Sequence, residues 1–242
     1  LVDFNRSGVP LIEIVTEPDL HSGEEARQLL TKLRSILRAL GVSTADMEKG
    51  AMRCEPNVSV RPRGSGELGI KTEIKNLNSF RSAKLAIEYE IDRQTRRLES
   101  GERVEQVTMG WNERDNRTVV QRSKEYAQDY RYFPEPDLPP LEFAPEYVAE
   151  IKADLPELPH ARRDRFVKDY ELRESDAEVL ASDSDTAAFF EETIAAVEAY
   201  DIEASTVANW ILGELFRLLS ERGIENTSLR CAPIAFLPLN FS

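Results

Sequence analysis

Apolar residues recur at helical spacing in two long segments in the first half of the chain. The first comprises Ala26, Leu29, Leu30, Leu33, Leu37 and Leu40, whose spacing places them on one face of a helix. Ser22 and Glu25, just ahead of this segment, form a capping box, and Gly41 follows it where a left-handed residue commonly ends a helix. The same spacing runs from about Phe80 to Glu99. The pattern predicts two amphipathic helices, the first of which covers a sheet with its apolar face.

Shorter stretches before, between and after these helices are typical of strands. The apolar run from Val9 to Val15 ends at a Glu-Pro-Asp turn, which favours a strand. Further alternating stretches predict a hairpin and then two strands on either side of a polar turn. These stretches span residues 51–61, 70–74, 104–109 and 118–122. The first part of the chain therefore reads as an α+β domain with an antiparallel sheet.

Proline density marks a domain boundary near Phe143. Residues 134–145 contain five prolines, which forbid a regular helix and favour an extended connection. We expect one domain at 1–143 and a second at 144–242. The stretches rich in helix formers beyond the boundary are 145–153, 160–171, 175–181, 184–199 and 204–221. The second domain reads as a small all-α bundle.

Charge is the bulk property that departs most from an average globular protein. The net charge is −13; residues 1–143 carry 24 acidic and 22 basic side chains, whereas residues 144–242 carry 20 acidic and 9 basic ones. An acidic surface repels a phosphate backbone, so any nucleic-acid contact is expected on the first domain. Its basic residues concentrate at Arg61, Arg63, Lys71, Lys75, Arg81 and Lys84. Composition alone favours an ordinary solvated face for them.

Composition also excludes several classes of protein. Hydrophobic residues make up 41% and charged residues 31%, which argues against disorder. No apolar run approaches the roughly 20 residues of a membrane helix, and no secretion signal opens the chain, so we expect a cytoplasmic protein with no membrane partner. Cys54 and Cys231 are too few for a disulfide framework or a paired zinc signature, and we expect both to be buried thiols.

Glu13 is the most informative single residue. It lies within the apolar run Leu11 to Val15, where a carboxylate costs several kcal/mol unless something pairs with it or binds it. A metal ion, an arginine or protonation could each satisfy it. Alternatively, Glu13 lies on the solvated face of an edge strand.

Two other stretches concentrate polar groups. Residues 72–79 precede a predicted helix, whose free N–H groups could bind a phosphate; capping by Asn78 or Ser79 explains them equally. Residues 129–133 surround Arg131 with aromatic side chains and could form a substrate-binding wall or a domain interface. Since the chain contains no phosphate-loop, dinucleotide-binding, hydrolase or zinc-protease motif, the residues alone name no reaction.

Four stretches resemble the B subunit of the tRNA-dependent amidotransferase, in the family order and with family-like spacing. They are VDFNRSGVPLIEIVTEPD at 2–19, MEKGAMRCEPNVSVRP at 47–62, KTEIKNLNSF at 71–80 and DYRYFPEPDLPPL at 129–141. Residues 155–167 and 208–215 are similar to the helical cradle of that family.

The resemblance implies a catalytic domain of the glutamine synthetase type followed by a helical cradle domain. It also implies a ligase that uses ATP and Mg²⁺ to phosphorylate the side-chain carboxylate of mischarged Glu-tRNA(Gln) or Asp-tRNA(Asn). Ammonia from a glutaminase A subunit then displaces the phosphate, because phosphorylation gives a poor electrophile a leaving group. A C subunit completes the expected heterotrimer.

Individual roles follow from the same resemblance. Glu13 matches a metal-binding glutamate of the family. The remaining residues are expected to line the catalytic cavity or the ammonia route, with Glu73, Lys75, Asn76 and Arg131 as catalytic groups and Lys71 and Asn78 as cofactor-binding groups.

The chain also departs from the family pattern. The family's other metal ligands precede the position of Leu1, so we expect this stretch to be inactive alone. Residues after about Leu229 do not resemble the family, which indicates a piece without the mobile tail domain. Met109 and Ala51 replace an expected arginine and serine. Two other readings stay open: the archaeal amidotransferase E subunit, and a non-catalytic scaffold that holds the A subunit and tRNA.

Overall fold

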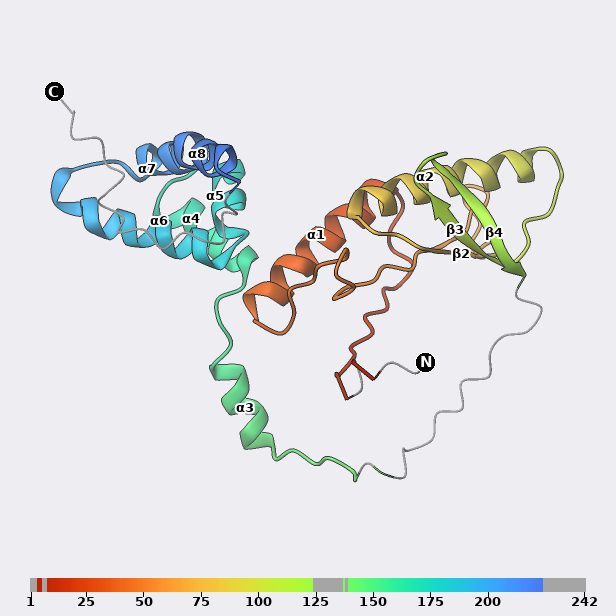
Figure 1. Cartoon of the computed structure of the whole chain (residues 1–242), viewed down its shortest axis with the longest axis horizontal. Coiled ribbons are helices and arrows are strands. Elements are labelled where there is room, and N and C mark those ends of the chain that lie inside the picture. The colour runs from red at the N-terminus through yellow and green to blue at the C-terminus, as the bar shows by residue number, and fades with distance from the viewer. Residues whose placement is uncertain (1–3, 6–7, 124–136, 138, 224–242) are drawn as a thin grey trace. The chain divides into compact units, whose positions relative to one another are not determined.

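The computed structural model describes residues 4–5, 8–123, 137 and 139–223, and these form two compact units (Figure 1). The first, called the sheet unit, comprises Leu1–Leu29 and Cys54–Lys124. The second, called the helical unit, comprises Leu30–Arg53 and Glu125–Ser242. Each unit is described by itself below.

The helix α1 (Gly23–Ala39) begins and ends as its sequence predicts. The Ser22 hydroxyl accepts a hydrogen bond from the Glu25 backbone N–H at 3.1 Å, and the Glu25 carboxylate accepts one from the His21 N–H at 2.6 Å. Gly41 takes a left-handed φ of 66° just past the helix end. Only glycine adopts this conformation without steric cost, so both predicted helix signals are confirmed.

The helix α2 (Phe80–Glu99) also has the predicted bounds. Ser79 is its N-cap, and its hydroxyl accepts a hydrogen bond from the Ser82 N–H at 3.0 Å. Past the other end, Gly101 has a φ of 80° and its N–H donates to the Leu98 carbonyl. The capping interpretation of residues 78–79 is therefore confirmed, with Ser79 as the capping residue.

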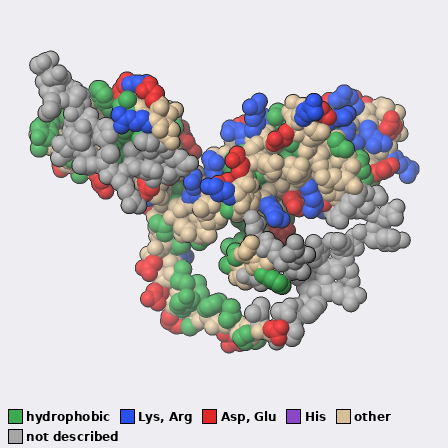
Figure 2. Space-filling view, in the orientation of Figure 1, with side chains coloured by type: hydrophobic (Ala, Val, Ile, Leu, Met, Phe, Trp, Pro, Cys, Tyr) green, Lys and Arg blue, Asp and Glu red, His purple; other side chains and the backbone are tan. Residues whose placement is uncertain are grey.

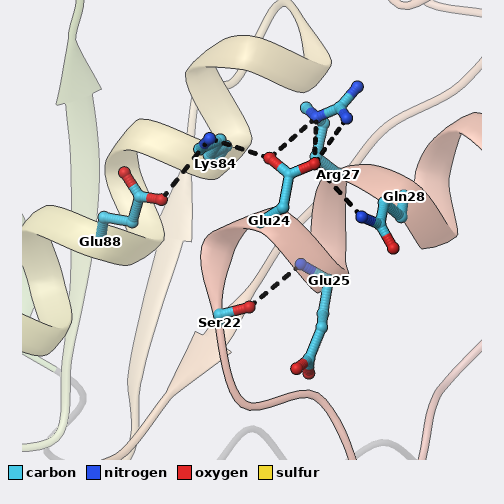
Figure 3. Close-up of polar contacts among 7 residues, drawn as sticks. All are labelled: Ser22, Glu24, Glu25, Arg27, Gln28, Lys84 and Glu88. Atoms are coloured by element: carbon cyan, nitrogen blue, oxygen red, sulfur yellow. Dashed lines mark hydrogen bonds and ion pairs between the residues drawn. The ribbon is translucent and has the colours of Figure 1, made fainter.

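A charged cluster joins the start of α1 to α2 (Figure 3). Glu24 accepts hydrogen bonds from the Arg27 guanidinium, at 2.5 to 3.1 Å, and from Lys84 Nζ of α2 at 2.8 Å. These bonds, with that to Arg27 first, lower the pKa of Glu24 to about 2. Gly23 allows the close approach: a Cβ there would lie 2.5 Å from the Lys84 carbonyl oxygen.

Four strands form one sheet in the sheet unit. They are β1 (Asn57–Val58), β2 (Thr72–Lys75), β3 (Val107–Asn112) and β4 (Arg117–Ser123), in the spatial order β1-β2-β3-β4. β1 and β2 form the predicted hairpin, although β1 is only two residues long. β3 and β4 form a second antiparallel pair, with an irregularity between Thr108 and Met109. Helices together with this sheet confirm the α+β class.

The expectation of a wholly antiparallel sheet is wrong, because β2 and β3 are parallel. Glu73 pairs with Thr108 and Lys75 with Gly110. The reason is the connection: α2 carries the chain back along the sheet, so the following strand starts at the same end as β2. In Figure 1, α2 lies along the sheet as this crossover. The carboxyl ends of β2 and β3 and the amino end of α2 consequently meet.

The strand predicted at Val9 to Val15 is also absent from the described residues. This segment has no strand partner, and Leu11 is 92% exposed. A strand requires a neighbour to receive its hydrogen bonds, and a local apolar run cannot reveal whether one is present. Glu13 is exposed as well, so the argument that burial must be compensated does not apply to it here.

Buried polar side chains help to hold α2 on the sheet. Glu90 is 0% exposed, and its carboxylate accepts hydrogen bonds from Arg93 at 2.6 and 2.9 Å, from Gln94 Nε2 at 2.9 Å and from Thr118 Oγ1 at 3.2 Å. Gln94 Nε2 also donates to the Val58 carbonyl at 3.0 Å. The network therefore links α2 to both β1 and β4, and its donors compensate the burial of the carboxylate.

The helical unit confirms the helices predicted beyond the proline segment, with ends that shift by a few residues. Its elements are α3 (Pro145–Ala153), α4 (Pro159–Asp169), α5 (Glu174–Ala181), α6 (Ser184–Val197), the 3₁₀ turn η1 (Glu198–Tyr200), α7 (Ala204–Trp210), the π-helical turn η2 (Ile211–Leu215) and α8 (Phe216–Glu221). One apolar cluster forms its core, in which Phe166 and Phe190 are 0% exposed. The glutamine synthetase type and the cradle stay predictions.

The surface of the described residues shows no sign of a membrane segment. Among these residues, no helix is long and apolar enough to cross a bilayer. Figure 2 shows basic and acidic side chains interspersed over the sheet unit. Cys54 is half-buried, and burial raises the pKa of its thiol to about 11, whereas Cys231 lies outside the described residues.

Candidate functional site

β2 places Glu73 and Lys75 on the sheet face that points away from α2. Successive side chains of a strand alternate between faces, and Thr72 and Ile74 are the buried pair. Lys75 Nζ lies 3.0 Å from the Glu55 carboxylate and 3.6 Å from that of Glu73. The strand thus brings two predicted site residues together and adds Glu55.

The Glu55–Lys75–Glu73 trio has a definite protonation state. The hydrogen bond to Glu55, reinforced by the charges of Glu55 and Glu73, raises the pKa of Lys75 above its ordinary value. Lys75 is therefore a fixed cation at neutral pH and cannot act as a base there. Thr108 Oγ1 of β3 donates to the other carboxylate oxygen of Glu73 at 3.0 Å. Both oxygens of Glu73 are held, which fixes its orientation.

A cleft of about 450 Å³ lies beside this trio, at the carboxyl ends of β2 and β3. It is lined by Asn76, Asn78, Gly110, Trp111, Asn112, Glu113, Val119 and Gln121. Because Lys75 pairs with Gly110, the trio and the cleft meet at this register position. The carboxyl end of parallel strands is a common place for ligand binding. Four amide side chains and one carboxylate suit a ligand that both donates and accepts hydrogen bonds.

Asn76 closes one wall of the cleft. Its φ of 62° lies in the left-handed region, which asparagine tolerates better than most residues, and this turns the chain from β2 toward α2. Its side-chain Nδ2 donates to the Trp111 carbonyl at 3.3 Å, which joins the ends of β2 and β3. Asn78 is exposed and also lines the cleft.

Glu113 brings a negative charge to the first turn of α2. Its carboxylate accepts a hydrogen bond from the Ser82 hydroxyl at 2.6 Å, and Ser82 is in turn 2.8 Å from the Ser79 hydroxyl. A carboxylate at this position benefits from the positive end of the helix dipole. The phosphate expected at this helix end would meet Glu113, and phosphate binding here stays a prediction.

Gly110 makes room for the Gln121 side chain across β3. A Cβ at position 110 would lie only 2.3 Å from Gln121 Nε2. The missing side chain therefore lets the glutamine amide reach the cleft from β4. The sequence offered no local sign of this contact, since the two residues lie on different strands.

The predicted site residues fall into three groups. Glu73, Lys75, Asn76 and Asn78 come together around the trio and the cleft. Lys71 is exposed just before β2, and Glu13 is exposed in the unpaired segment. Arg131 lies outside the described residues. Sequence reasoning missed Glu55, Thr108, Glu113 and Gln121, of which Thr108 could have been found from a parallel β2–β3 register.

The described residues do not assemble the magnesium site that the family resemblance implies. Mg²⁺ requires several oxygen ligands in near-octahedral geometry. Among these residues, no three or more His, Cys, Asp or Glu side chains converge on one point. Glu55 and Glu73 are bridged by Lys75, whose single positive charge offsets one of the two carboxylate charges. The metal-binding role of Glu13 stays a prediction.

The part of the chain that contains the trio and the cleft matches a known protein family. Residues 1–149 match the model of the GatB/GatE catalytic domain, a region that contains the whole sheet unit described here. The chain belongs to the GatB/GatE family. All described residues of the trio and the cleft fall within the part that defines this GatB/GatE domain.

Three similar curated relatives of this GatB/GatE member are each named as the B subunit of aspartyl/glutamyl-tRNA(Asn/Gln) amidotransferase. The relative from Roseiflexus castenholzii is 55% identical over 223 residues, 92% of this chain and 46% of the relative. That from Persephonella marina is 51% identical, covering 98% and 50%, and that from Thermotoga maritima is 50% identical, covering 99% and 49%. The chain therefore spans about half the length of the curated relatives it matches.

Proposed function

We propose that this chain is part of the B subunit of a tRNA-dependent amidotransferase. The complete subunit would use ATP to activate the side-chain carboxylate of Glu-tRNA(Gln) or Asp-tRNA(Asn) and convert it to the amide. Glutamine, hydrolysed by an A subunit, would supply the ammonia, and a C subunit would complete the assembly. The names of relatives at 50 to 55% identity support this proposal.

The Glu73–Lys75 arrangement beside the cleft is the observation on which the site assignment rests. When ammonia attacks the activated acyl group, negative charge develops on its carbonyl oxygen, and a fixed cation nearby stabilises that charge. Lys75 is such a cation, and Glu55 and Glu73 hold its ammonium beside the strand ends. We assign Lys75 the role of stabilising this charge, and Glu73 that of positioning Lys75.

The cleft is the proposed binding place for the aminoacyl group on the tRNA. Its amide side chains can donate to a carboxylate or its acyl phosphate and accept from an amine. Glu113, fixed by Ser82, disfavours an anion at the end of the cleft that borders α2. The carboxylate is therefore expected near Lys75 and Gln121, and the α-amino group near Glu113.

Amidation by the complete subunit, co-expressed with its A and C partners, tests this proposal. Lys75→Met keeps the aliphatic stem and removes the charge, so amidation of mischarged tRNA should fall roughly tenfold or more. Glutamine hydrolysis in the same tubes should persist. Lys32→Met, which removes one charge from an exposed position on α1, is the matched control.

Two results would contradict the assignment. Unchanged amidation in Lys75→Met would make the trio structural and favour a scaffold role for this face. Equal loss of amidation and glutamine hydrolysis would indicate failed assembly. Partial recovery in Lys75→Arg, which restores the cation with a different shape, would support an electrostatic role.

A further inference from the structure

Gln121 is the extra residue of a β-bulge between β3 and β4. Arg122 of β4 pairs with Thr108. Val120 pairs with Met109, the next residue of β3, so Gln121 lies between these two pairs without a partner in the register. A bulge changes the direction in which the extra side chain points, and bulges are common beside active sites. Here the redirected side chain lines the cleft.

The Gln121 amide forms the end of the cleft that lies away from Glu113. The described β3 residues that line the cleft begin at Gly110, and the lining continues to Glu113 in the turn that follows β3. Gln121 Nε2 lies over Gly110, where a Cβ would be only 2.3 Å from it. Lys75 of β2 pairs with Gly110 from the other side. The cleft therefore runs from Gln121 and Lys75 at one end to the Glu113 carboxylate at the other.

Two of the four amide side chains of the cleft are already engaged by the protein. Asn76 Nδ2 donates to the Trp111 carbonyl at 3.3 Å, and both polar atoms of Asn112 form hydrogen bonds within the turn that follows β3. Within the described part of the chain, no hydrogen bond engages the amide of Asn78 or of Gln121. Since nothing holds the Gln121 side chain, it can extend toward a short ligand and retract from a longer one.

We propose that Gln121 determines which aminoacyl group the cleft accepts, and that its reach lets the cleft hold an aspartyl group as well as a glutamyl group. A carboxylate only accepts hydrogen bonds, so Nε2 of Gln121 donates to it beside the Lys75 ammonium. Aspartate is one methylene shorter than glutamate, the same difference as between Asn and Gln. This inference rests on the proposed function, because it requires the aminoacyl group in the cleft with its amino group near Glu113.

Amidation of Asp-tRNA(Asn) and of Glu-tRNA(Gln) by the complete subunit, co-expressed with its A and C partners, tests this inference. Gln121→Asn withdraws the amide by one methylene, which only the longer glutamyl group makes up for. The ratio of kcat/KM for Asp-tRNA(Asn) to that for Glu-tRNA(Gln) should therefore fall roughly tenfold. Both values come from one preparation, so a loss of folded protein cancels in the ratio. Comparison with the unsubstituted protein cancels the contribution of the two tRNA bodies.

Two further variants separate the reach of the amide from its other properties. Gln121→Met keeps the length of the side chain and removes the donor, so both kcat/KM values should fall by roughly tenfold and their ratio should stay constant. Gln28→Asn makes the same shortening at an exposed position on α1 and should change neither value.

The outcomes distinguish this inference from the proposed function. An unchanged or raised ratio in Gln121→Asn, or the same fall in the ratio in Gln121→Met, would overturn the inference alone. So would unsubstituted protein that amidates Glu-tRNA(Gln) but not Asp-tRNA(Asn). Amidation of neither tRNA by unsubstituted protein, while glutamine hydrolysis persists, would overturn the proposed function and this inference with it.

Discussion

The core of the helical unit consists mainly of apolar side chains in contact with one another, whereas the core of the sheet unit includes charged and amide groups held by hydrogen bonds. Phe166, Tyr170 and Phe190 meet with ring centroids 5.1 to 5.6 Å apart in the helical unit. In the sheet unit, Glu90 and Gln94 are both in the interior at 0% exposure. An apolar core tolerates imprecise geometry, whereas a buried carboxylate loses much of its compensation when one partner is removed.

The largest expected effect is in the apolar core. Phe190→Ala removes a side chain that contacts two aromatic rings and leaves a cavity, so the helical unit should lose about 3–5 kcal/mol. 5-Fluorotryptophan labelling gives one reporter in each unit, Trp111 in β3 and Trp210 in α7. In a urea titration only the Trp210 signal should shift. Tyr200→Ala, at an exposed position, is the control.

The polar core should respond to loss of one partner. Glu90→Leu leaves Arg93, Gln94 and Thr118 without their acceptor, and the expected cost to the sheet unit is about 3 kcal/mol. The Trp111 signal reports it. Glu99→Leu removes an exposed carboxylate from the same helix and should have little effect. Equal stability of Glu90→Leu and the unsubstituted chain would show that the sheet unit does not need the hydrogen bonds of this carboxylate.

Close backbone packing inside the sheet unit gives a third prediction. Gly23→Ala puts a methyl group 2.5 Å from the Lys84 carbonyl oxygen, and separating α1 from α2 should cost about 2 kcal/mol. Gly66→Ala, where a Cβ meets nothing within 4 Å, is the control. A cost for Gly23→Ala no larger than for Gly66→Ala in thermal unfolding would mean that α1 moves freely relative to α2.

The smallest expected effect is the pH dependence of the charged cluster between α1 and α2. The folded pKa of Glu24, about 2, lies below its ordinary 4.5, so its stabilising contribution is present above pH 4.5 and is lost as the pH falls toward 2. The melting temperature of unsubstituted protein should therefore exceed that of Glu24→Gln at pH 7 and converge with it near pH 2. A constant difference would assign the effect to packing.

Local signals predicted the helices well. Ser22, Ser79, Gly41 and Gly101 act through bonds within their own turns, so their neighbours in sequence are sufficient to identify them. The helices α3 to α8 could be predicted for the same reason, because they follow one another along the chain. The burial of Glu90 and Gln94 on α2 was not predicted, because the helical spacing of apolar residues gives no sign that a carboxylate and an amide are buried. Two of their partners, the Thr118 hydroxyl of β4 and the Val58 carbonyl of β1, come from strands far away in sequence, which the helical period does not reveal.

The candidate site also contains some residues that the sequence could identify and others that it could not. The motif around Glu73, Lys75, Asn76 and Asn78 could be identified because it is continuous in sequence. Glu55, Thr108, Glu113 and Gln121 reach it from elements 20 or more residues away through pairing and packing. The prediction of a strand at residues 9–15 was wrong because it used only local information. The run is strand-like in sequence, but the described residues supply no partner strand.

The parallel pairing of β2 and β3 also sets an order of events during synthesis. Glu73 and its partner Thr108 are 35 residues apart, and the whole of α2 must be made between them. At about 5–20 residues per second, the interval is roughly 2 to 7 seconds. Throughout it, the side of β2 that will receive β3 is an unpaired strand edge, open to other nascent chains. We therefore expect the emerging sheet unit to depend on chaperones more than the helical unit that follows it.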